Sequence, residues 1–290
     1  MFVLICKKNE LNAAMEIKED EIKDIVKVIY DLSGYDFSDY SPKSLLRRFE
    51  KILIDYQCTM PELISKLKTN PLLIESIVKN ITVNTTEFFR DPLVWIEFEE
   101  KVIPELKKHE QIKIWHPGCS LGHEPYSMLI MLNEHQLLDK AEIIATDLNS
   151  DVLATAKNGI FRYFLDIEYL KNFDSVINRD PLNYKVPYDK YFDLEASKDI
   201  FKIKSEFLGK IKFYKHNLVQ DPFPHPDSFD LIMCRNVLIY FNMELQNKII
   251  YNFYKSLKLN SYLILGYHES ILGSLSNFFD KNGQVYKKSK

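Results

Sequence analysis

The chain has few cysteines, and none of its apolar runs is long. The four cysteines, Cys6, Cys58, Cys119 and Cys234, are scattered and form no C-x-x-C pair, which argues against a disulfide framework and favours a reducing compartment. The apolar run at residues 2–6 is too short for a signal-peptide core, and no later run reaches the ~18 apolar residues that a membrane span needs. We therefore expect a soluble cytoplasmic protein without direct membrane insertion.

A basic excess is also missing, as are the usual signatures of metal and dinucleotide sites. The formal net charge is -3, whereas a general nucleic-acid binder carries a strong positive charge. His123-Glu124 does not continue as H-E-x-x-H, because Ser127 stands in the fifth place, and the other histidines lack paired ligand spacing. No G-x-G-x-x-G follows the first expected strand. We expect a monomer that binds neither nucleic acid nor a metal.

The pattern of apolar residues along the chain changes near residue 84. Residues 15–83 show apolar residues at helical spacing and only one glycine, Gly34, which predicts an N-terminal helical domain. Residues 84–110 are expected to form a loop and then a helix that has Asp91 as its N-cap and Pro92 in its first turn and reaches Lys108. In residues 111–290, short apolar strands alternate with helices, which is typical of an α/β fold with a mostly parallel sheet covered on both faces. The expected strands are residues 112–115, 141–146, 211–214, 231–234 and 262–265.

Residues 163–207 fit this alternation poorly. They are rich in Asp, Lys, Tyr and Asn and contain two prolines. We interpret them as an insertion that either has little regular structure of its own or forms a small subdomain.

Polar residues follow the first two expected strands, where a parallel sheet places its ligand crevice. Gly118 and Gly122 bracket the first turn and would let the backbone approach a ligand, although a tight connection explains them equally well. Asp147 stands where an acid commonly accepts hydrogen bonds from ribose hydroxyls. It could instead cap the next helix, but Ser150 is available for that. Glu124, in the first turn of the next helix, suits the helix dipole or a ligand ammonium group.

Two further segments bring polar groups to the same crevice. Residues 84–90 read Asn-Thr-Thr-Glu-Phe-Phe-Arg and place three side chains that could grip a polar small molecule beside two aromatics. Arg235 and Asn236 end the fourth expected strand, and Tyr240 follows Asn236 by four residues. Core packing explains residues 237–239, whereas a buried Asn236 or Tyr240 would need polar partners.

Together and in this order, these segments resemble the chemotaxis receptor methyltransferases of the CheR family, which transfer methyl groups from S-adenosylmethionine to glutamate side chains of chemoreceptors. The likeness covers nearly the whole chain. It rests on N-x-T-x-F-F-R at residues 84–90, the turn ending in Glu-Pro-Tyr-Ser at 124–127, Ala-Thr-Asp at 145–147, His-Asn-Leu at 216–218, residues 229–241, Leu-Gly-Tyr-His-Glu-Ser at 265–270 and Val-Tyr-Lys at 285–287. The resemblance implies a Rossmann-like methyltransferase sheet in residues 111–290, with an N-terminal all-helical domain and a small inserted subdomain.

The resemblance also implies S-adenosylmethionine as cofactor and S-adenosylhomocysteine as product. With Gly118, the implied cofactor contacts are Asn84, Thr86, Arg90, Glu124, Asp147, Asn217, Leu218, Arg235 and Asn236. Arg90 and Tyr240 would stand close to the transferred methyl group as catalytic residues. The implied partner is the cytoplasmic helical domain of methyl-accepting chemotaxis receptors, met by Lys43, Arg47, Arg48 and Lys51; such a basic helix face is equally often only solvated.

Two features depart from the family pattern. The glycine turn commonly continues with two glutamates, whereas this chain has His123 before Glu124, so that one negative charge is lost or becomes pH-dependent. Residues 163–207 lack the family's glycine-rich loop, and we do not expect them to dock a receptor C-terminal peptide.

Two functions are alternatives to receptor methylation. One is a non-catalytic sensor that binds S-adenosylmethionine or another nucleotide on the same fold, and the other is a nicotinamide dehydrogenase.

Overall fold

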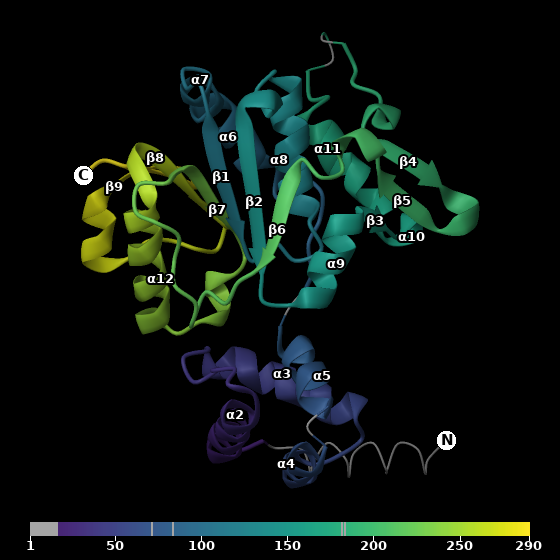
Figure 1. Ribbon diagram of the computed structural model, residues 1–290, viewed down its shortest axis with the longest axis vertical. Helices are drawn as coiled ribbons and strands as arrows, with labels where there is room; N and C mark the ends of the chain where they lie inside the picture. The colour runs from purple at the N-terminus through teal and green to yellow at the C-terminus, as the bar shows by residue number, and fades with distance from the viewer. Residues whose placement is uncertain (1–16, 71, 83, 181, 183) are drawn as a thin grey trace. The chain divides into compact units, whose positions relative to one another are not determined.

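The computed structural model describes residues 17–70, 72–82, 84–180, 182 and 184–290 (Figure 1). Cys6, the apolar residues 2–6 and residues 15, 16, 71 and 83 of the expected helical domain lie outside the described residues, as do residues 181 and 183 of the insertion. The chain divides into two compact units. One comprises Met1–Val83 and Tyr240–Leu245, and the other comprises Asn84–Ile239 and Gln246–Lys290.

The first unit is helical, as its apolar spacing predicts. Its helices are α2 (Glu19–Ser33), α3 (Pro42–Asp55), α4 (Met60–Thr69) and α5 (Leu72–Ile81). Their apolar stripes meet in one core, in which Ile25, Phe49 and Leu63 are fully buried. Gly34 ends α2 in the left-handed conformation (φ 76°) that favours glycine. The segment Tyr240–Leu245 joins this unit through hydrogen bonds such as Asn242 N to Asp39 O (2.8 Å).

The second unit is built on a seven-stranded sheet with the order β6-β2-β1-β7-β8-β10-β9. The strands are β1 (Ile112–Pro117), β2 (Ala141–Asp147), β6 (Ile211–Lys215), β7 (Phe229–Cys234), β8 (Leu257–Leu265), β9 (Phe279–Asn282) and β10 (Val285–Lys288). The pairs from β6 to β8 are parallel, whereas β10 runs antiparallel to β8 and β9. This confirms the α/β class. The chain runs outward from β1 to β2 and β6 and then returns to β7 on the other side of β1, so the carboxyl ends of β1 and β7 flank the point where strand order reverses.

Two helix boundaries differ from the expectation. The helix that begins after Asp91 ends as α6 (Pro92–Lys101), and a separate short helix α7 covers Ile103–Leu106. Pro104 accounts for the break, because proline lacks the N–H that a continuous helix needs. The helices that follow β1 and β2 are α8 (His123–Glu134) and α9 (Ser150–Asn158). Asn149, not Ser150, caps α9, and its side chain accepts a hydrogen bond from Asp151 N at 2.9 Å.

The region interpreted as an insertion has regular structure. Its strands β3 (Ile160–Phe161), β4 (Phe192–Glu195) and β5 (Ile200–Ile203) form a three-stranded antiparallel sheet in the order β3-β5-β4. The helices α10 (Tyr163–Asp166) and α11 (Leu170–Val176) connect β3 to the rest, and Figure 1 shows the small sheet beyond α9, apart from the main sheet. Of the two interpretations the small subdomain is right. Strands of two to four residues are too short for periodicity to reveal.

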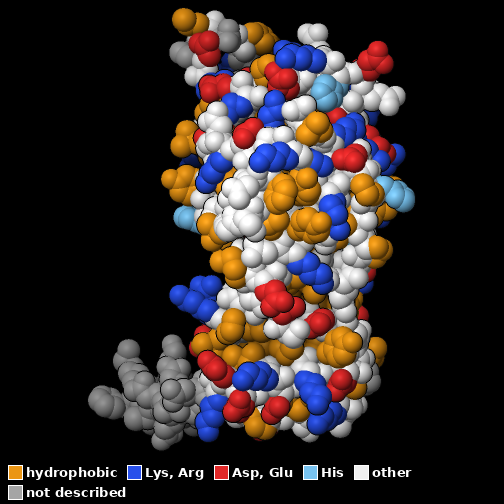
Figure 2. Space-filling model, turned by 90° about the vertical axis from the view of Figure 1, so that its left-hand side faces the viewer, with side chains coloured by type: hydrophobic (Ala, Val, Ile, Leu, Met, Phe, Trp, Pro, Cys, Tyr) orange, Lys and Arg blue, Asp and Glu red, His pale blue; other side chains and the backbone are white. Residues whose placement is uncertain are grey.

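The last helix, α12, covers Met243–Ser256 and precedes β8. Figure 2 shows Lys/Arg and Asp/Glu side chains interspersed over the face that it draws, in keeping with the small formal net charge of -3. In the part of the chain that the structure describes, no helix combines the length and the apolar character that crossing a membrane requires.

The turn after β1 brings three strand ends together. Gly118 N donates to Thr146 O of β2 (2.7 Å), and Gly118 has a φ of 72°. A Cβ atom there would lie 2.4 Å from Cγ2 of Val237, which follows β7. Glycine is therefore needed both for the left-handed backbone and for the close approach of this turn to the segment after β7.

We expect Gly118→Ala to lower the free energy of unfolding by roughly 2–4 kcal/mol, because backbone strain and a steric clash add together. Gly209→Ala is the matched control, since Gly209 also has a positive φ (83°) but has open space around its missing Cβ. It should cost only about 1–2 kcal/mol. Thermal and urea unfolding of the two variants would measure the difference, and equal losses would contradict the role given to Val237.

Candidate active site

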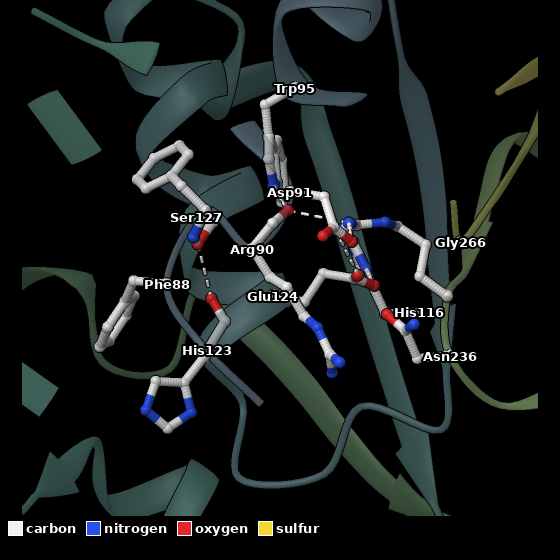
Figure 3. A network of polar contacts seen from close by, with 12 residues as sticks. Phe88, Arg90, Asp91, Trp95, His116, His123, Glu124, Ser127, Asn236 and Gly266 are labelled. Carbon is white, nitrogen blue, oxygen red and sulfur yellow. Dashed lines mark hydrogen bonds and ion pairs between the residues drawn. The ribbon is translucent and has the colours of Figure 1, made fainter. Parts of the chain in front are cut away.

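Figure 3 shows a network of polar contacts at the carboxyl edge of the sheet, and the hydrogen bonds of a buried arginine, Arg235, tie this network together. The side chain of Arg235, directly after β7, is only 1% exposed. Its Nη2 donates to the backbone oxygen of Arg90 (2.8 Å) and to Asp91 Oδ2 (2.7 Å), and its Nη1 donates to Glu124 Oε2 (3.2 Å). A guanidinium withdrawn from water needs charged and hydrogen-bonded partners of this kind. Arg235 therefore fixes residues 84–91, which we call the strap, against the first turn of α8.

The backbone of the strap is bent sharply around Arg90. Phe89 (φ 49°) and Asp91 (φ 53°) both adopt the left-handed conformation, which is unfavourable for residues other than glycine. The oxygen of Arg90 also accepts a hydrogen bond from Trp95 Nε1 (3.1 Å), while the Arg90 side chain extends away from that contact and its Nη1 donates to Thr85 O (3.3 Å) (Figure 3). Asp91 was expected to cap α6, but its side chain makes no capping bond and is engaged by Arg235 instead.

The two aromatics of the strap are anchors rather than ligand-facing groups. Phe88 is fully buried, and its ring lies 5.4 Å from Phe161 and 5.3 Å from Phe201 of the small sheet. Phe89 is equally buried, and its N–H donates to Ser127 Oγ of α8 (2.9 Å). The strap is thus attached to both the subdomain and α8.

Glu124 combines fixed geometry with spare acceptor capacity. Its Oε1 lies 3.0 Å from Nδ1 of His116, a fully buried residue of β1, and its Oε2 accepts from Arg235. The side chain remains 16% exposed. A carboxylate can accept about four hydrogen bonds, so Glu124 can still receive a ligand donor such as an ammonium group.

Asp147 ends β2 and has a similar arrangement. Its Oδ2 accepts from Ser120 N (2.8 Å) and its Oδ1 from Asn149 N (2.9 Å). Burial raises the pKa of Asp147, and these backbone N–H groups act in the opposite direction. Asp147 therefore supports both the glycine turn and the residue that caps α9, and it keeps acceptor positions for ligand hydroxyl groups.

Asn217 and Leu218 follow β6 beside Asp147. His216 N donates to Asp147 O at 3.0 Å, which places this loop next to the end of β2. The Asn217 side chain is used locally, because its Oδ1 accepts from Val219 N (2.9 Å) and its Nδ2 donates to Gln220 Oε1 (2.7 Å). Leu218 is 9% exposed.

Asn236 follows Arg235 in a left-handed conformation, with a φ of 60°. Its backbone N–H donates to the carboxylate of Glu269 (2.8 Å), which lies in the loop after β8. The structure thus brings the strap, Gly118, Glu124, Asp147, residues 217–218 and residues 235–236 to one edge of the sheet.

The remaining candidate residues lie at the start of the strap and in the helical unit. Asn84 and Thr86 lie half-buried at the start of the strap. Tyr240 ends the short 3₁₀ helix Leu238–Tyr240 and belongs to the helical unit, in which its backbone oxygen accepts from Ser41 N (2.8 Å). The basic candidates Lys43, Arg47, Arg48 and Lys51 also belong to that unit: they lie on α3, where Arg48 is half-buried and the other three are exposed.

His123 does not take the place of a site carboxylate. Its ring is buried, points away from Glu124 (Figure 3), and lies 2.7 Å from Asp166 Oδ1 and 4.5 Å from the Phe88 ring. His123 therefore packs with the subdomain. Among the described residues no group of three or more His, Cys, Asp or Glu side chains is arranged to hold a metal ion.

Sequence reasoning missed three residues of the site: Asp91, His116 and Glu269. Asp91 was read as a helix cap, and His116 was dismissed with the unpaired histidines. Glu269 entered only as a matched position, although its place three residues after Gly266 in the loop after β8 was a usable signal. Each acts through a partner distant in sequence, which local patterns do not identify.

Because the buried guanidinium of Arg235 binds three partners, the stability of the protein should be sensitive to its substitution. We expect Arg235→Lys to lower the free energy of unfolding by about 1–3 kcal/mol and to speed hydrogen exchange in the strap, because an ammonium group cannot reach three partners in the geometry of a planar guanidinium. Arg162→Lys is the control: Arg162 pairs with Asp199 (2.6 Å) but is 70% exposed, so the change should cost at most about 1 kcal/mol. Similar effects at both positions would count against the proposed tie.

The residues at this edge suit a nucleoside ligand that carries a cationic amino group. The glycine turn leaves no room for a Cβ, Asp147 keeps acceptors for hydroxyl groups, and Glu124 keeps acceptors for an ammonium group. This donor and acceptor set fits S-adenosylmethionine, whose ribose and amino acid portion need such partners.

Comparisons with known proteins identify the family. Residues 84–287 match the family model described as CheR methyltransferase, SAM binding domain, and residues 20–82 match CheR methyltransferase, all-alpha domain. The chain is similar to a chemotaxis protein methyltransferase of Borreliella burgdorferi, with 30% identity over 92% of this chain and 94% of that protein. It is also similar to one of Listeria innocua, with 30% identity over 85% of this chain and 91% of that protein. These matches cover both units and give no support to a non-catalytic sensor. The chain belongs to the CheR methyltransferase family, with S-adenosylmethionine as its cofactor.

Proposed function

We propose that this protein methylates glutamate side chains of chemotaxis receptors, producing glutamate methyl esters and S-adenosylhomocysteine for sensory adaptation. The observation that carries the proposal is the tie of Arg235 to Asp91, Glu124 and the Arg90 backbone. It holds the strap beside the carboxyl edge of a methyltransferase sheet. The substrate follows from the names of the relatives, which are chemotaxis protein methyltransferases.

In this proposal the cofactor lies along the edge from Glu124 to Asp147. Glu124 accepts from its ammonium group, Asp147 accepts from its ribose hydroxyls, and Gly118 lets the backbone approach. Asn84, Thr86 and Arg90 of the strap, together with Asn217, Leu218 and Asn236, complete the contacts. Arg235 acts through Glu124 and Asp91, since its guanidinium is already engaged by them.

The chemistry needs little help from an acid or base. A glutamate carboxylate with an ordinary pKa near ~4.3 is ionised at neutral pH and is itself the nucleophile. S-adenosylmethionine held at this edge would supply a methyl group on a positively charged sulfur, and the sulfur would keep the C–S electron pair as the carboxylate oxygen bonds to the methyl carbon. The protein aligns the reacting groups and excludes water. Burial raises the pKa of both Cys119 and Cys234 well above the usual thiol range, so neither offers a competing thiolate.

Arg90 and Tyr240 are the proposed catalytic residues. Arg90 is held at its backbone by Arg235 and Trp95, which leaves the guanidinium to steer an incoming carboxylate. Tyr240 is proposed from its match to the family motif at residues 229–241, and its hydroxyl group would help to orient the substrate carboxylate.

We expect Arg90→Ala and Tyr240→Phe to lower the turnover number by about tenfold or more, because each loses a group that aligns the substrate carboxylate. The dissociation constant for S-adenosylhomocysteine should change less. Transfer of radiolabelled methyl groups to receptor-containing membranes, released by base, measures turnover, and calorimetry measures binding. Unchanged turnover in both variants would refute these roles.

The helical unit is the proposed receptor-binding part. We propose that residues 15–83 form a helical domain, that residues 84–110 form the strap and a linker helix, and that residues 111–290 form the methyltransferase domain with residues 163–207 inserted. The family matches to residues 20–82 and 84–287 support this division. On α3, Lys43, Arg47, Arg48 and Lys51 form a basic group suited to the acidic helices of a receptor's cytoplasmic domain.

We expect the double reversal Arg47→Glu with Arg48→Glu to raise the receptor KM several-fold and to reduce its dependence on salt, because charge pairs across an interface are screened by ions. Lys66→Glu with Lys68→Glu is the control with the same change in net charge, placed on exposed residues of α4. The KM for S-adenosylmethionine should stay the same in both. Equal effects of the two pairs would indicate a general charge effect and not docking through α3.

We propose that the protein works as a monomer in the cytoplasm. The free thiols of Cys58, Cys119 and Cys234 support a reducing compartment.

A further inference from the structure

One carboxylate organises the loop that contains Asn236. Glu269 is 6% exposed, and its two oxygens accept hydrogen bonds from five backbone N–H groups. Oε2 accepts from Asn236 N (2.8 Å) and Gly266 N (2.7 Å). Oε1 accepts from the N–H groups of Val237 (2.9 Å), Leu238 (2.8 Å) and Ile239 (3.3 Å).

These bonds specify a backbone that the local sequence would not favour. Asn236 has a φ of 60°, which is uncommon outside glycine. Consecutive N–H groups that converge on one anion keep such a turn in place. Gly266 has no room for a side chain, since a Cβ there would lie 2.6 Å from Glu269 Oε2 and 2.9 Å from Asn236 N. The loops after β7 and β8 are therefore packed against each other around a single carboxylate.

Burying a carboxylate at this position has an unfavourable desolvation energy. Burial raises the pKa of Glu269, and only the N–H bonds oppose that effect. A neutral apolar filler would avoid the cost but could not hold four successive N–H groups in a turn. The arrangement thus serves the shape of residues 236–239 more than the stability of the core.

We propose that Glu269 is a positioning residue for the methyl donor: by holding the backbone of residues 236–239, it sets the place of Asn236 at the cofactor edge. This inference rests on the proposed function, because it takes Asn236 as a cofactor contact.

Glu269→Gln tests the inference with almost no change of volume. The amide oxygen can replace Oε1 and keep its three N–H partners, but the NH₂ group then faces two N–H donors, those of Asn236 and Gly266. We expect the dissociation constant for S-adenosylhomocysteine, measured by calorimetry, to rise about tenfold or more. Hydrogen exchange followed by NMR should speed up at Asn236 and Gly266 more than at residues 237–239, while the amides of β7 keep their protection.

Glu206→Gln is the matched control, because Glu206 is exposed and belongs to the same unit. It should leave both affinity and exchange unchanged. If Glu269→Gln does not fold, Glu269→Asp replaces it: the shorter carboxylate cannot reach both loops, and the same loss of affinity is expected with β7 still protected.

A purely structural role for Glu269 would lower the melting temperature without changing the affinity of the folded protein. A Glu269 variant with wild-type affinity for S-adenosylhomocysteine would therefore overturn the inference. Failure of the proposed function is distinguishable, since it would appear as wild-type protein that binds S-adenosylhomocysteine but transfers no methyl group to receptors. The binding comparison between variants would then still decide the role of Glu269.

Discussion

The candidate site depends on one buried guanidinium group, that of Arg235, which needs charged and hydrogen-bonded partners. Arg235 is almost completely withdrawn from water, and its two terminal nitrogens donate to a carboxylate from the strap, a carboxylate from α8 and a backbone oxygen of the strap. Loss of both carboxylates would leave an uncompensated charge in a poorly solvated place, which is far more costly than the pairing is favourable. The strap is therefore held against the sheet by the protein's own charges, before any ligand contributes.

Backbone strain also occurs at this edge. Phe89, Asp91, Ser120 and Asn236 all have positive φ although none is glycine. Each is fixed by a specific polar contact: Ser127 holds Phe89, Arg235 holds Asp91, Asp147 holds Ser120, and Glu269 holds Asn236. Unfavourable conformations that persist because their surroundings determine them are typical of binding sites. The polar residues around this edge thus hold the backbone in shape.

The fold was largely predictable because its main signals are local. Helical spacing identified α2 to α5, and short apolar runs identified β1, β2, β6, β7 and β8. Long-range pairing was not predictable. Asp91 looked like a helix cap until Arg235 was seen beside it. The sequence around Glu269 does not indicate that this carboxylate binds four successive N–H groups in a distant part of the chain. The subdomain was ambiguous because its strands are shorter than the period they would have to display. By contrast, Pro104 was a visible signal that one long helix should have been two.

Phe88 links the core of the subdomain to the strap. Its ring completes an aromatic core whose other members come from β3, β4 and β5, while its neighbours in the chain form the strap. The interior of the subdomain must therefore stay compatible with the strap. A chimera that exchanges this subdomain between family members would therefore fold only if the aromatic side chains that surround Phe88 are exchanged together with it.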